Sequence, residues 1–293
     1  MLDRQRQSPV YRFAPSPNGR LHLGHALSAL LNSDMAAQTR GTLLLRIEDI
    51  DLARCTPAFE AGIYEDLAWL GIDWQKPVRR QSDHFSDYRQ ALERLKEMGL
   101  VYPAFMTRGE VQARVKQSEI AGGRWPRDPD GSPLYPQDDR QRSEYESAEL
   151  LKSGRRYAWR LDMEKAIEHA GRDLSWMESG DGERGIILAD PEKWGDVILS
   201  RSDAPSSYHL SVVVDDALQN VTHVVRGADL FQATAVHVLL QKLLGLPQPL
   251  YHHHRLITDA TGRKLSKSDG DAGIEALRHR GLSPADIRRL VGC

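Results

Sequence analysis

The sequence contains only two cysteines in 293 residues, Cys55 and Cys293. Two distant thiols are too few for a disulfide framework or for a four-thiolate zinc site. No run approaches the length of about eighteen apolar residues that a membrane helix needs. Residues 1–9 are polar and lack the apolar stretch of a signal peptide. We therefore expect a cytoplasmic protein that makes no contact with a membrane.

Neither sign of charge dominates the chain, because 39 Lys and Arg residues face 41 Asp and Glu residues, a formal charge of −2. This balance indicates no general affinity for nucleic acid, so a contact with a polyanion must come from local basic residues. With 27% charged and 40% hydrophobic residues the composition is that of a globular protein. The length predicts one large α/β domain, or a core domain with an insertion.

The first fifty residues read as a strand, a loop and a helix followed by a second strand. An apolar run at residues 10–14 ends in a turn at 15–19, and leucines recur at helical spacing from His22 onwards. The nearly continuous apolar run at 42–47 is typical of a strand buried in a parallel sheet. This βαβ unit predicts a Rossmann-like, doubly wound parallel sheet with an inserted α+β subdomain and a short helical segment at the C-terminus.

The rest of the chain divides into three predicted regions. Residues 1–100 and 185–245 are expected to form a split Rossmann-like domain, 101–184 the inserted subdomain, and 246–293 a polar loop with a short helical tail. Apolar periodicity predicts helices and strands, whereas Gly, Pro and Asp crowd into a loop at 122–139. The expected helices cover residues 57–70, 84–98, 163–170 and 229–244, and the expected strands cover 157–161, 185–188 and 221–225.

His22, Gly24 and His25 lie where the first loop meets the first helix. The N-terminus of a helix exposes unpaired N–H groups and favours a phosphate, and Gly24 leaves room for its close approach. Imidazoles three residues apart share one helix face, so both can donate hydrogen bonds to charge that builds on an α-phosphate. Taken alone, the four residues 22–25 are more simply interpreted as two surface histidines; the second motif favours a nucleotide site.

Lys264, Ser266 and Lys267 lie in a polar loop with glycines on both sides. A loop with two ammonium groups and hydroxyls can close over a triphosphate and neutralise the leaving pyrophosphate. We expect Lys267 to be the main ATP contact, while Lys264 either contacts ATP or faces solvent.

Four blocks, in this order, resemble the class I aminoacyl-tRNA synthetases and in particular their glutamyl branch. Residues 12–19 followed by 21–25 are similar to that branch's opening signature, and 264–268 to its signature lysine loop. Residues 46–51 and 221–230 are similar to two further blocks. Because the chain ends soon after the lysine loop, the resemblance is to the short paralogues without an anticodon-binding domain.

The resemblance implies both an activity and a set of substrate residues. The short paralogues activate L-glutamate with ATP, without tRNA, and transfer it to the queuosine base in the anticodon of tRNA(Asp). Arg12 and Arg226 are implied as carboxylate ligands and Glu48 as the ammonium ligand, with Ala14, Ser16 and Tyr208 against the amino acid. ATP is then a co-substrate, with magnesium, and a monomer is expected. Asp215 and Asp216, at the end of an apolar run, either orient Arg226, act as a cap or are solvated, and they are not part of the predicted site.

No metal site is expected. Many relatives hold zinc through a Cys-x-Cys pair and a Tyr-x-x-x-Cys element, but here Ala104, Met106 and Asp139 replace the cysteines. We predict no structural zinc and apolar packing of Phe105 and Met106 in its place. The run of His252, His253 and His254 alternates faces, so at most two could bind one ion, and proximity to the nucleotide site is the better interpretation.

Three other functions are compatible with parts of the sequence. A minimal glutamyl-tRNA synthetase would charge the acceptor end of a tRNA. A catalytically silent tRNA-binding paralogue would have broken nucleotide motifs, whereas both motifs are intact. A histidine-motif nucleotidyltransferase explains the two phosphate motifs but not Arg12, Glu48, Tyr208 and Arg226. Four arginines near the C-terminus either contact tRNA phosphates or form a solvated helix face, namely Arg278, Arg280, Arg288 and Arg289.

Overall fold

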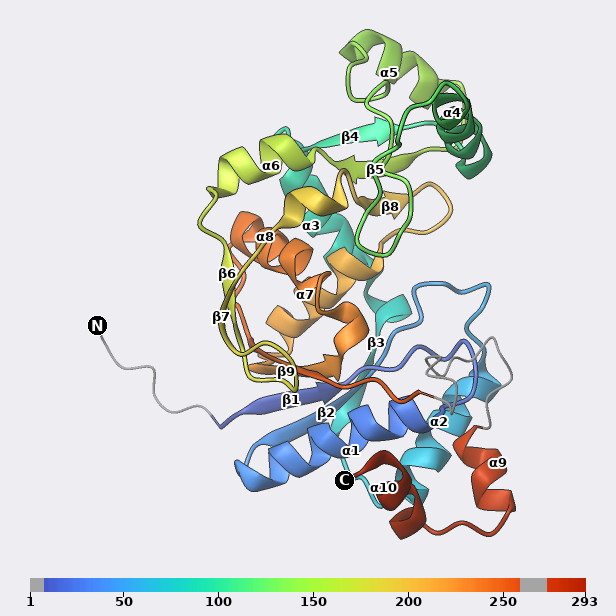
Figure 1. Ribbon diagram of the computed structural model, residues 1–293, viewed down its shortest axis with the longest axis vertical. Helices are drawn as coiled ribbons and strands as arrows, with labels where there is room; N and C mark the ends of the chain where they lie inside the picture. Colours follow the sequence, from blue (N-terminus) through green and yellow to red (C-terminus); the bar gives the residue numbers. More distant parts are fainter. Residues whose placement is uncertain (1–7, 259–272) are drawn as a thin grey trace, which may run out of the picture.

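The computed structural model describes residues 8–258 and 273–293 (Figure 1). Within these ranges the strands are β1 Val10–Phe13, β2 Thr42–Ile47, β3 Gln75–Arg80, β4 Val101–Ala104, β5 Ala158–Leu161, β6 Ser175–Glu178, β7 Gly185–Leu188, β8 Ile198–Arg201, β9 His223–Gly227 and β10 Leu250–His254. The α-helices are α1 Leu23–Gln38, α2 Pro57–Trp69, α3 Phe85–Glu97, α4 Arg108–Ile120, α5 Glu144–Lys152, α6 Met163–Ala170, α7 Tyr208–Leu218, α8 Thr234–Leu244, α9 Ile274–His279 and α10 Pro284–Val291.

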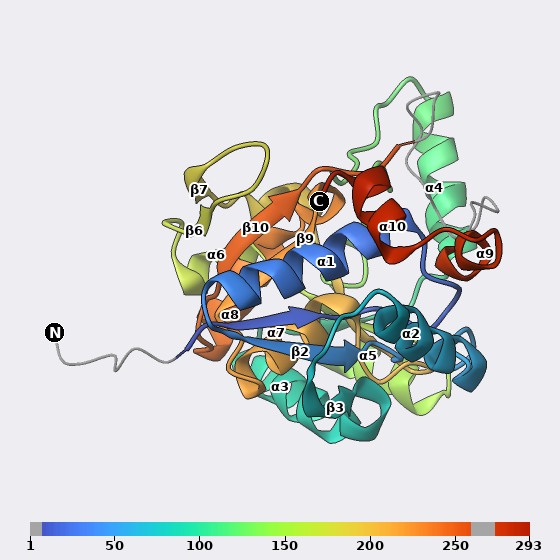
Figure 2. The same cartoon turned by 90° about the horizontal axis from the view of Figure 1, so that it is seen from below.

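The large sheet has seven strands in the order β3-β2-β1-β9-β10-β6-β7. Every neighbouring pair is parallel except the antiparallel β6–β7 hairpin at one edge. Helix α1 covers one face of the sheet and α7 lies against the opposite face (Figures 1 and 2). The predicted doubly wound, mostly parallel α/β fold is therefore confirmed. Carboxyl ends of parallel strands in such a sheet form the usual ligand-binding edge.

Each face of the sheet has its own apolar core. Tyr11, Leu30 and Ile47 lie between the sheet and α1, and Ile287 and Val291 of α10 join them, all less than 2% exposed. On the other face α3, α7 and α8 bury a second cluster that includes Leu95, Leu210 and Leu239. The C-terminal helices therefore complete the core beneath α1 instead of projecting from the molecule.

The inserted subdomain is built on a second sheet of three antiparallel strands, β4-β5-β8, with α4 and α5 nearby (Figure 1). The predicted boundaries do not follow these sheets. Strand β6 lies inside the predicted insertion, residues 101–184, but pairs with β10 of the large sheet. Strand β8 lies in the predicted Rossmann-like region, residues 185–245, but pairs with β5 of the small sheet. Strand β10, in the predicted tail, is also a strand of the large sheet. A short apolar run identifies a strand but not its partner, so the sequence could not assign these strands to their sheets.

One predicted helix begins later than expected. Its first residues, Ala228–Leu230, form a separate 3-10 turn, and α8 begins at Thr234. The carbonyl of Leu230 accepts hydrogen bonds from Arg226 Nη2 at 3.3 Å and from the Thr234 hydroxyl at 3.2 Å. Side chains, and not a backbone N–H of a continuing helix, therefore occupy this carbonyl, and the 3-10 turn stays separate from α8.

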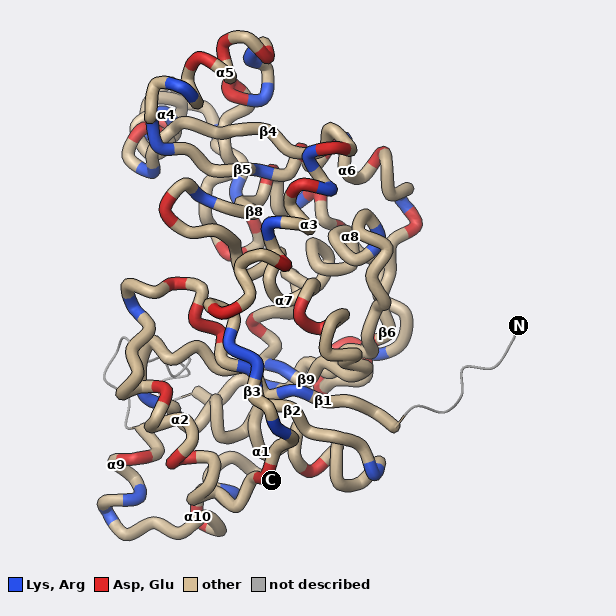
Figure 3. Tube along the Cα trace, turned by 180° about the vertical axis from the view of Figure 1, so that it is seen from behind, with Lys and Arg blue, Asp and Glu red and all other residues tan. Residues whose placement is uncertain are grey.

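Charged residues are distributed over the molecule without one dominant sign. Figure 3 shows Lys and Arg interspersed with Asp and Glu over both sheets and their helices. This distribution agrees with the near-zero net charge.

Candidate active site

The predicted site residues of the described ranges line one cavity of about 600 Å³. This first cavity lies at the carboxyl ends of β1, β2 and β9 and at the N-terminus of α1. It collects residues from four separate parts of the chain: Arg12, Ala14, Ser16, His22, Gly24, His25, Glu48, Tyr208 and Arg226. Lys264, Ser266 and Lys267 lie outside the described residues.

The N-terminus of α1 has its two histidines folded onto the backbone. His22 Nδ1 accepts from the Gly24 N–H at 3.1 Å, and His25 Nδ1 accepts from the His22 N–H at 3.2 Å. The two rings are 3.8 Å apart between centroids. Since both Nδ1 atoms accept, each neutral imidazole carries its proton on Nε2. Both rings are therefore hydrogen-bond donors at a helix N-terminus, as a phosphate site requires.

Gly24 is required by the ring of His22. A Cβ at this position would lie 2.9 Å from His22 Cε1 and 3.1 Å from His22 Nδ1. The sequence suggested that Gly24 makes room for a ligand; in the structure the neighbouring imidazole occupies that space.

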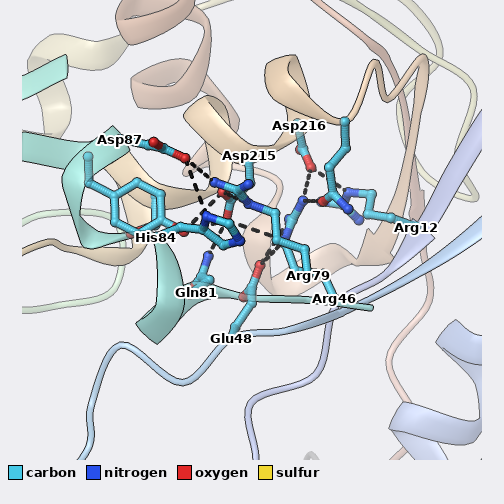
Figure 4. Close-up of polar contacts among 12 residues, drawn as sticks. Arg12, Arg46, Glu48, Arg79, Gln81, His84, Asp87, Asp215 and Asp216 are labelled. Atoms are coloured by element: carbon cyan, nitrogen blue, oxygen red, sulfur yellow. Dashed lines mark hydrogen bonds and ion pairs between the residues drawn. The ribbon is translucent and has the colours of Figure 1, made fainter. Parts of the chain in front are cut away.

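A buried network of charges fixes Arg12 and Glu48 (Figure 4). Arg46 is fully buried and donates to Asp216 at 2.7 Å and to Glu48 at 3.0 Å. Asp216 also accepts from Arg12 Nε at 3.1 Å. The described residues supply no acceptor for the Arg12 Nη atoms, and Arg12 lines the cavity, so its forked end is available for a carboxylate.

The pKa shifts of these carboxylates follow from burial and from the two arginines. Burial raises the pKa of Glu48, and Arg46 and Arg12 offset only part of that effect. Burial also acts to raise the pKa of Asp216, but Arg12 and Arg46 outweigh it and hold this pKa below its usual range. The negative charge of Asp216 is therefore stabilised by two cations, whereas the charge of Glu48 is only partly compensated by Arg46 and Arg12. An incoming ammonium group would supply one.

Asp215 has a different set of partners. It accepts from Arg79 at 2.7 Å, Gln81 at 2.8 Å and the Tyr88 hydroxyl at 2.9 Å. Neither Asp215 nor Asp216 hydrogen-bonds Arg226. The suggestion that this pair orients Arg226 was wrong, because α7 directs both carboxylates towards β1, β2 and β3.

Arg226 projects from β9 and is 5% exposed. Its guanidinium donates to His253 Nε2 at 3.0 Å, His237 Nδ1 at 3.2 Å and the Tyr208 hydroxyl at 3.4 Å. The remaining donors reach Thr234 Oγ1 at 2.8 Å and the Leu230 carbonyl. All five N–H groups therefore have acceptors within the protein, and the bond to Tyr208 is the longest of them. Tyr208 itself lines the first cavity.

A second cavity of about 550 Å³ adjoins the first. The two cavities share Ser16, Glu48 and Tyr208, and the second extends to residues of the inserted subdomain such as Tyr135 and Arg160. A molecule in the second cavity would therefore approach Ser16, Glu48 and Tyr208 of the first cavity from the side of the inserted subdomain.

The positions that correspond to the relatives' zinc ligands hold a hydrogen-bond network. Asp139 Oδ2 accepts from the Tyr135 hydroxyl at 2.5 Å, from the Phe105 N–H at 2.7 Å and from the Met106 N–H at 3.3 Å. The Arg160 guanidinium stacks 3.9 Å above the Tyr135 ring. With its oxygen used by three donors and a cation close by, this set does not fit zinc. Phe105 is buried and Met106 packs nearby, but polar contacts join the segments as well.

The three consecutive histidines have separate partners. His252 contacts Ser179, His253 contacts Glu178, and His254 Nδ1 contacts the Arg255 carbonyl. Among the residues that the structure describes, no group of three or more metal-ligating side chains occurs. His254 lines the first cavity, which agrees with the expected proximity of this segment to the nucleotide site.

Sequence reasoning missed the residues that hold the pocket from behind. Arg46, Asp216 and His253 contact predicted ligands but are not in the predicted set, and Glu178 contacts His253 in turn. Arg46 stands in one of the family-like blocks, so charge inside an apolar strand was an available signal. Glu178 lies at the end of β6, a short strand that the sequence did not predict and that belongs to none of the family-like blocks, so no such signal exists for it.

Comparison with known proteins identifies the class. Residues 10–292 match the family model "tRNA synthetases class I (E and Q), catalytic domain". The chain is 47% identical to the Glutamyl-Q tRNA(Asp) synthetase of Rhodobacter capsulatus, over 97% of this chain and 99% of that protein. It is 37% identical to Glutamate--tRNA ligase 2 of a Methylobacterium species, over 97% of this chain but 60% of the relative. A crystal structure of a glutamate tRNA ligase from Elizabethkingia meningosepticum in complex with its amino acid is 29% identical, with a TM-score of 0.73, and covers 90% of this chain and 53% of that one.

The fold and the first cavity thus define a class I aminoacyl-tRNA synthetase catalytic domain, a class that uses ATP. The chain belongs to the class I (E and Q) tRNA synthetase family, and within it to the glutamyl-Q tRNA(Asp) synthetases. None of the helices in residues 8–258 and 273–293 combines the length and apolarity needed to cross a membrane.

Proposed function

We propose that the protein activates L-glutamate with ATP in the absence of tRNA and transfers it to the queuosine base in the anticodon of tRNA(Asp). The observation that carries this proposal is the first cavity, where two arginines, a half-buried glutamate and two histidines of a helix N-terminus meet. A dicarboxylic amino acid with one ammonium group needs cationic donors and one anion, and ATP needs donors for its phosphates. The names of two relatives support the same activity.

In the first step a carboxylate oxygen of glutamate attacks the α-phosphorus of ATP, and the bond to pyrophosphate breaks. Arg12, Glu48, Tyr208 and Arg226 orient glutamate, with Ala14 and Ser16 beside it, and this positioning lowers the entropic barrier. The Nε2–H groups of His22 and His25 donate to oxygens that gain charge. Lys264, Ser266 and Lys267 complete our proposed ATP site by contacting the phosphates.

In the second step a hydroxyl of the queuosine ring attacks the activated carbonyl and AMP leaves. The proposed entry for this base is the second cavity, because it shares Ser16, Glu48 and Tyr208 with the first cavity. A nucleoside there would face the carbonyl of a bound adenylate.

Further parts of the proposal concern cofactors and state. Magnesium accompanies ATP, as is usual for triphosphates, and no structural zinc is required. We propose a monomer in the cytoplasm. Metal analysis of the purified protein tests the zinc part, and one zinc per chain would contradict it.

Glutamate-dependent exchange of pyrophosphate into ATP without RNA tests the activity. We expect exchange by the wild type and a loss of at least about tenfold in Arg12→Gln, because a charged hydrogen-bond donor is lost. Arg172→Gln is the control, since Arg172 lies on the surface and is 81% exposed. Exchange that appears only with added tRNA would favour the minimal glutamyl-tRNA synthetase, and no exchange under either condition would contradict both functions.

A further inference from the structure

A chain of side chains behind Arg226 has only one consistent arrangement of protons. An arginine donates and never accepts, so His253 Nε2 and His237 Nδ1 must both be unprotonated where they face it. His237 then donates from Nε2 to His209 Nδ1, 3.1 Å away. His253 must likewise carry its proton on Nδ1. Burial first, and Arg226 in addition, lowers the pKa of His209 and of His253 to about 4 and that of His237 well below its usual value, so all three rings are neutral.

Glu178 selects this tautomer of His253. Its Oε2 atom lies 2.6 Å from His253 Nδ1 and accepts the ring proton. Its Oε1 atom accepts from the N–H groups of Ser179, Gly180 and His253, so the carboxylate is held from two strands, β6 and β10. Burial acts to raise the pKa of Glu178, but these bonds, led by the one from His253, bring it down to about 2. Glu178 is thus an ionised hydrogen-bond acceptor, and both Glu178 and His253 are buried, with 2% and 3% of their surfaces exposed.

We propose that Glu178 and His253 are positioning residues that hold the Arg226 guanidinium in the orientation that binds the substrate carboxylate. This inference rests on the proposed glutamate activation. Glu178 fixes the proton of His253 on Nδ1, and Nε2 is then the acceptor that fixes Arg226 Nε.

Orientation matters here because Arg226 has no spare donor. Its N–H groups are directed to His253, His237, Thr234, the Leu230 carbonyl and the Tyr208 hydroxyl. Tyr208 and Leu230 line the first cavity, and the 3.4 Å contact to Tyr208 is the longest of the five. A carboxylate receives this N–H together with the Tyr208 hydroxyl. A guanidinium that rotates towards a missing acceptor would withdraw the donor.

Three substitutions test separately the contact of Glu178 with His253 and the contact of His253 with Arg226. Glu178→Gln keeps the volume but presents an NH₂ group to His253 Nδ1, which shifts the ring proton to Nε2 and sets two donors against each other at Arg226. His253→Asn keeps a polar group near Nδ1 and removes the acceptor for Arg226. His253→Gln places an oxygen near the position of Nε2 and restores that acceptor. His252→Asn is the matched control on the same strand, because its contact is with Ser179.

The readout is the exchange reaction at varied glutamate and varied ATP. In Glu178→Gln and His253→Asn we expect the KM for glutamate to rise at least about tenfold, the range expected for a lost bond to a charged group, with kcat and the KM for ATP nearly unchanged. We expect His253→Gln to recover most of the affinity and His252→Asn to match the wild type. A purely structural role would lower thermal stability and leave the glutamate KM unchanged, which would overturn the proposal, as would equal defects in His253→Gln and His253→Asn.

A second measurement does not depend on the variants. Long-range ¹H–¹⁵N NMR of the wild type reports which ring nitrogen of His253 carries the proton, and we expect Nδ1. A proton on Nε2 would overturn the proposal even if the variants failed to fold. If the wild type catalyses no glutamate-dependent exchange, the proposed function fails; if it is active and the variants keep its glutamate KM, only the positioning role fails.

Discussion

A network of buried charged residues connects the core of this structure to the first cavity. Arg46 is 0% exposed and is surrounded by Glu48, Asp215 and Asp216. A buried charge that loses its partner is costly, so such groups survive only in complete networks. Here the network also has a use, because its outer members Arg12 and Glu48 face the first cavity. The same side chains therefore contribute to folding and to the shape of the substrate pocket.

Asp66 in α2 is a buried carboxylate without such a network. It is 1% exposed. Among residues 8–258 and 273–293, its Oδ2 atom has no hydrogen-bond partner and the nearest cation is Arg278 at 4.0 Å. Burial raises its pKa to about 6, above the ordinary value near 3.9. The folded state thus binds this proton more tightly than the unfolded state, which favours folding below about pH 4. That contribution is lost as the pH rises through about 6.

We predict that Asp66→Asn stabilises the protein at pH 7.5 by about 1 to 3 kcal/mol, because the substitution removes the cost of an ionised buried group. The gain should vanish near pH 4, where Asp66 is already protonated. Denaturant unfolding at both pH values measures the effect, and Glu65→Gln, at a 61% exposed neighbour that also approaches Arg278, is the control. A gain that is the same at both pH values would contradict this account.

At the scale of elements, the first turn of α1 combines a helix cap with a set of proton donors. His22 is the N-cap residue, and its ring caps the Gly24 N–H in place of the usual Ser, Thr, Asp or Asn. An imidazole that caps through Nδ1 leaves Nε2–H for another partner. The capping interaction therefore sets the tautomer that phosphate chemistry needs.

We predict that Gly24→Ala lowers the exchange activity about tenfold or more, since a misplaced donor to the reacting phosphate costs at least that much. The added Cβ would force the His22 ring out of its position. Stability should change little, because Ala is favoured over Gly within a helix by about 1 kcal/mol and offsets the weakened cap. Activity assays and thermal unfolding of the same sample test this pair of outcomes, and an active Gly24→Ala enzyme would refute the role of the His22 ring.

At the scale of the whole molecule, the C-terminal helices are part of the catalytic domain. Helix α10 buries Ile287 and Val291 beneath α1, and Arg288 forms a two-pronged ion pair with Asp34 at 2.8 and 2.9 Å. Arg278 and Arg289 also pair with carboxylates of the chain, at Glu65 and Asp286. The sequence offered tRNA contact or a solvated helix face for the basic tail, and neither interpretation included the ion pairs that these three arginines form within the chain. Arg280 is exposed and has no ion pair within the described residues.

We predict that Arg288→Ala lowers the free energy of unfolding by about 1 kcal/mol, the upper range for a partly exposed ion pair with good geometry. The KM for the tRNA substrate should stay unchanged, because the guanidinium is directed to Asp34. Urea unfolding and transfer kinetics measure the two quantities, and Arg280→Ala is the comparison at an unpaired arginine. A weaker interaction with tRNA at unaltered stability would show that Arg288 contacts the nucleic acid.

The sequence by itself determined the local elements and the inner surface of the first cavity. Apolar periodicity located β1, β2 and α6, and the spacing of His22, Gly24 and His25 after a strand indicated a helix N-terminus. Most of the predicted substrate residues came from family-like blocks, since each block keeps its ligands within a few neighbouring positions, whereas Tyr208 lies outside these blocks.

Only the tertiary structure decided what stands behind those ligands. The contacts of Arg46 with Asp216 and of His253 with Glu178 join residues 170 and 75 positions apart. They depend on which strands pair and in what register, and periodicity carries no information about either. The predicted domain boundaries placed the residues of β6, β8 and β10 in the wrong regions for the same reason: a strand's sequence reports its own burial, while its partners depend on the fold of the whole chain.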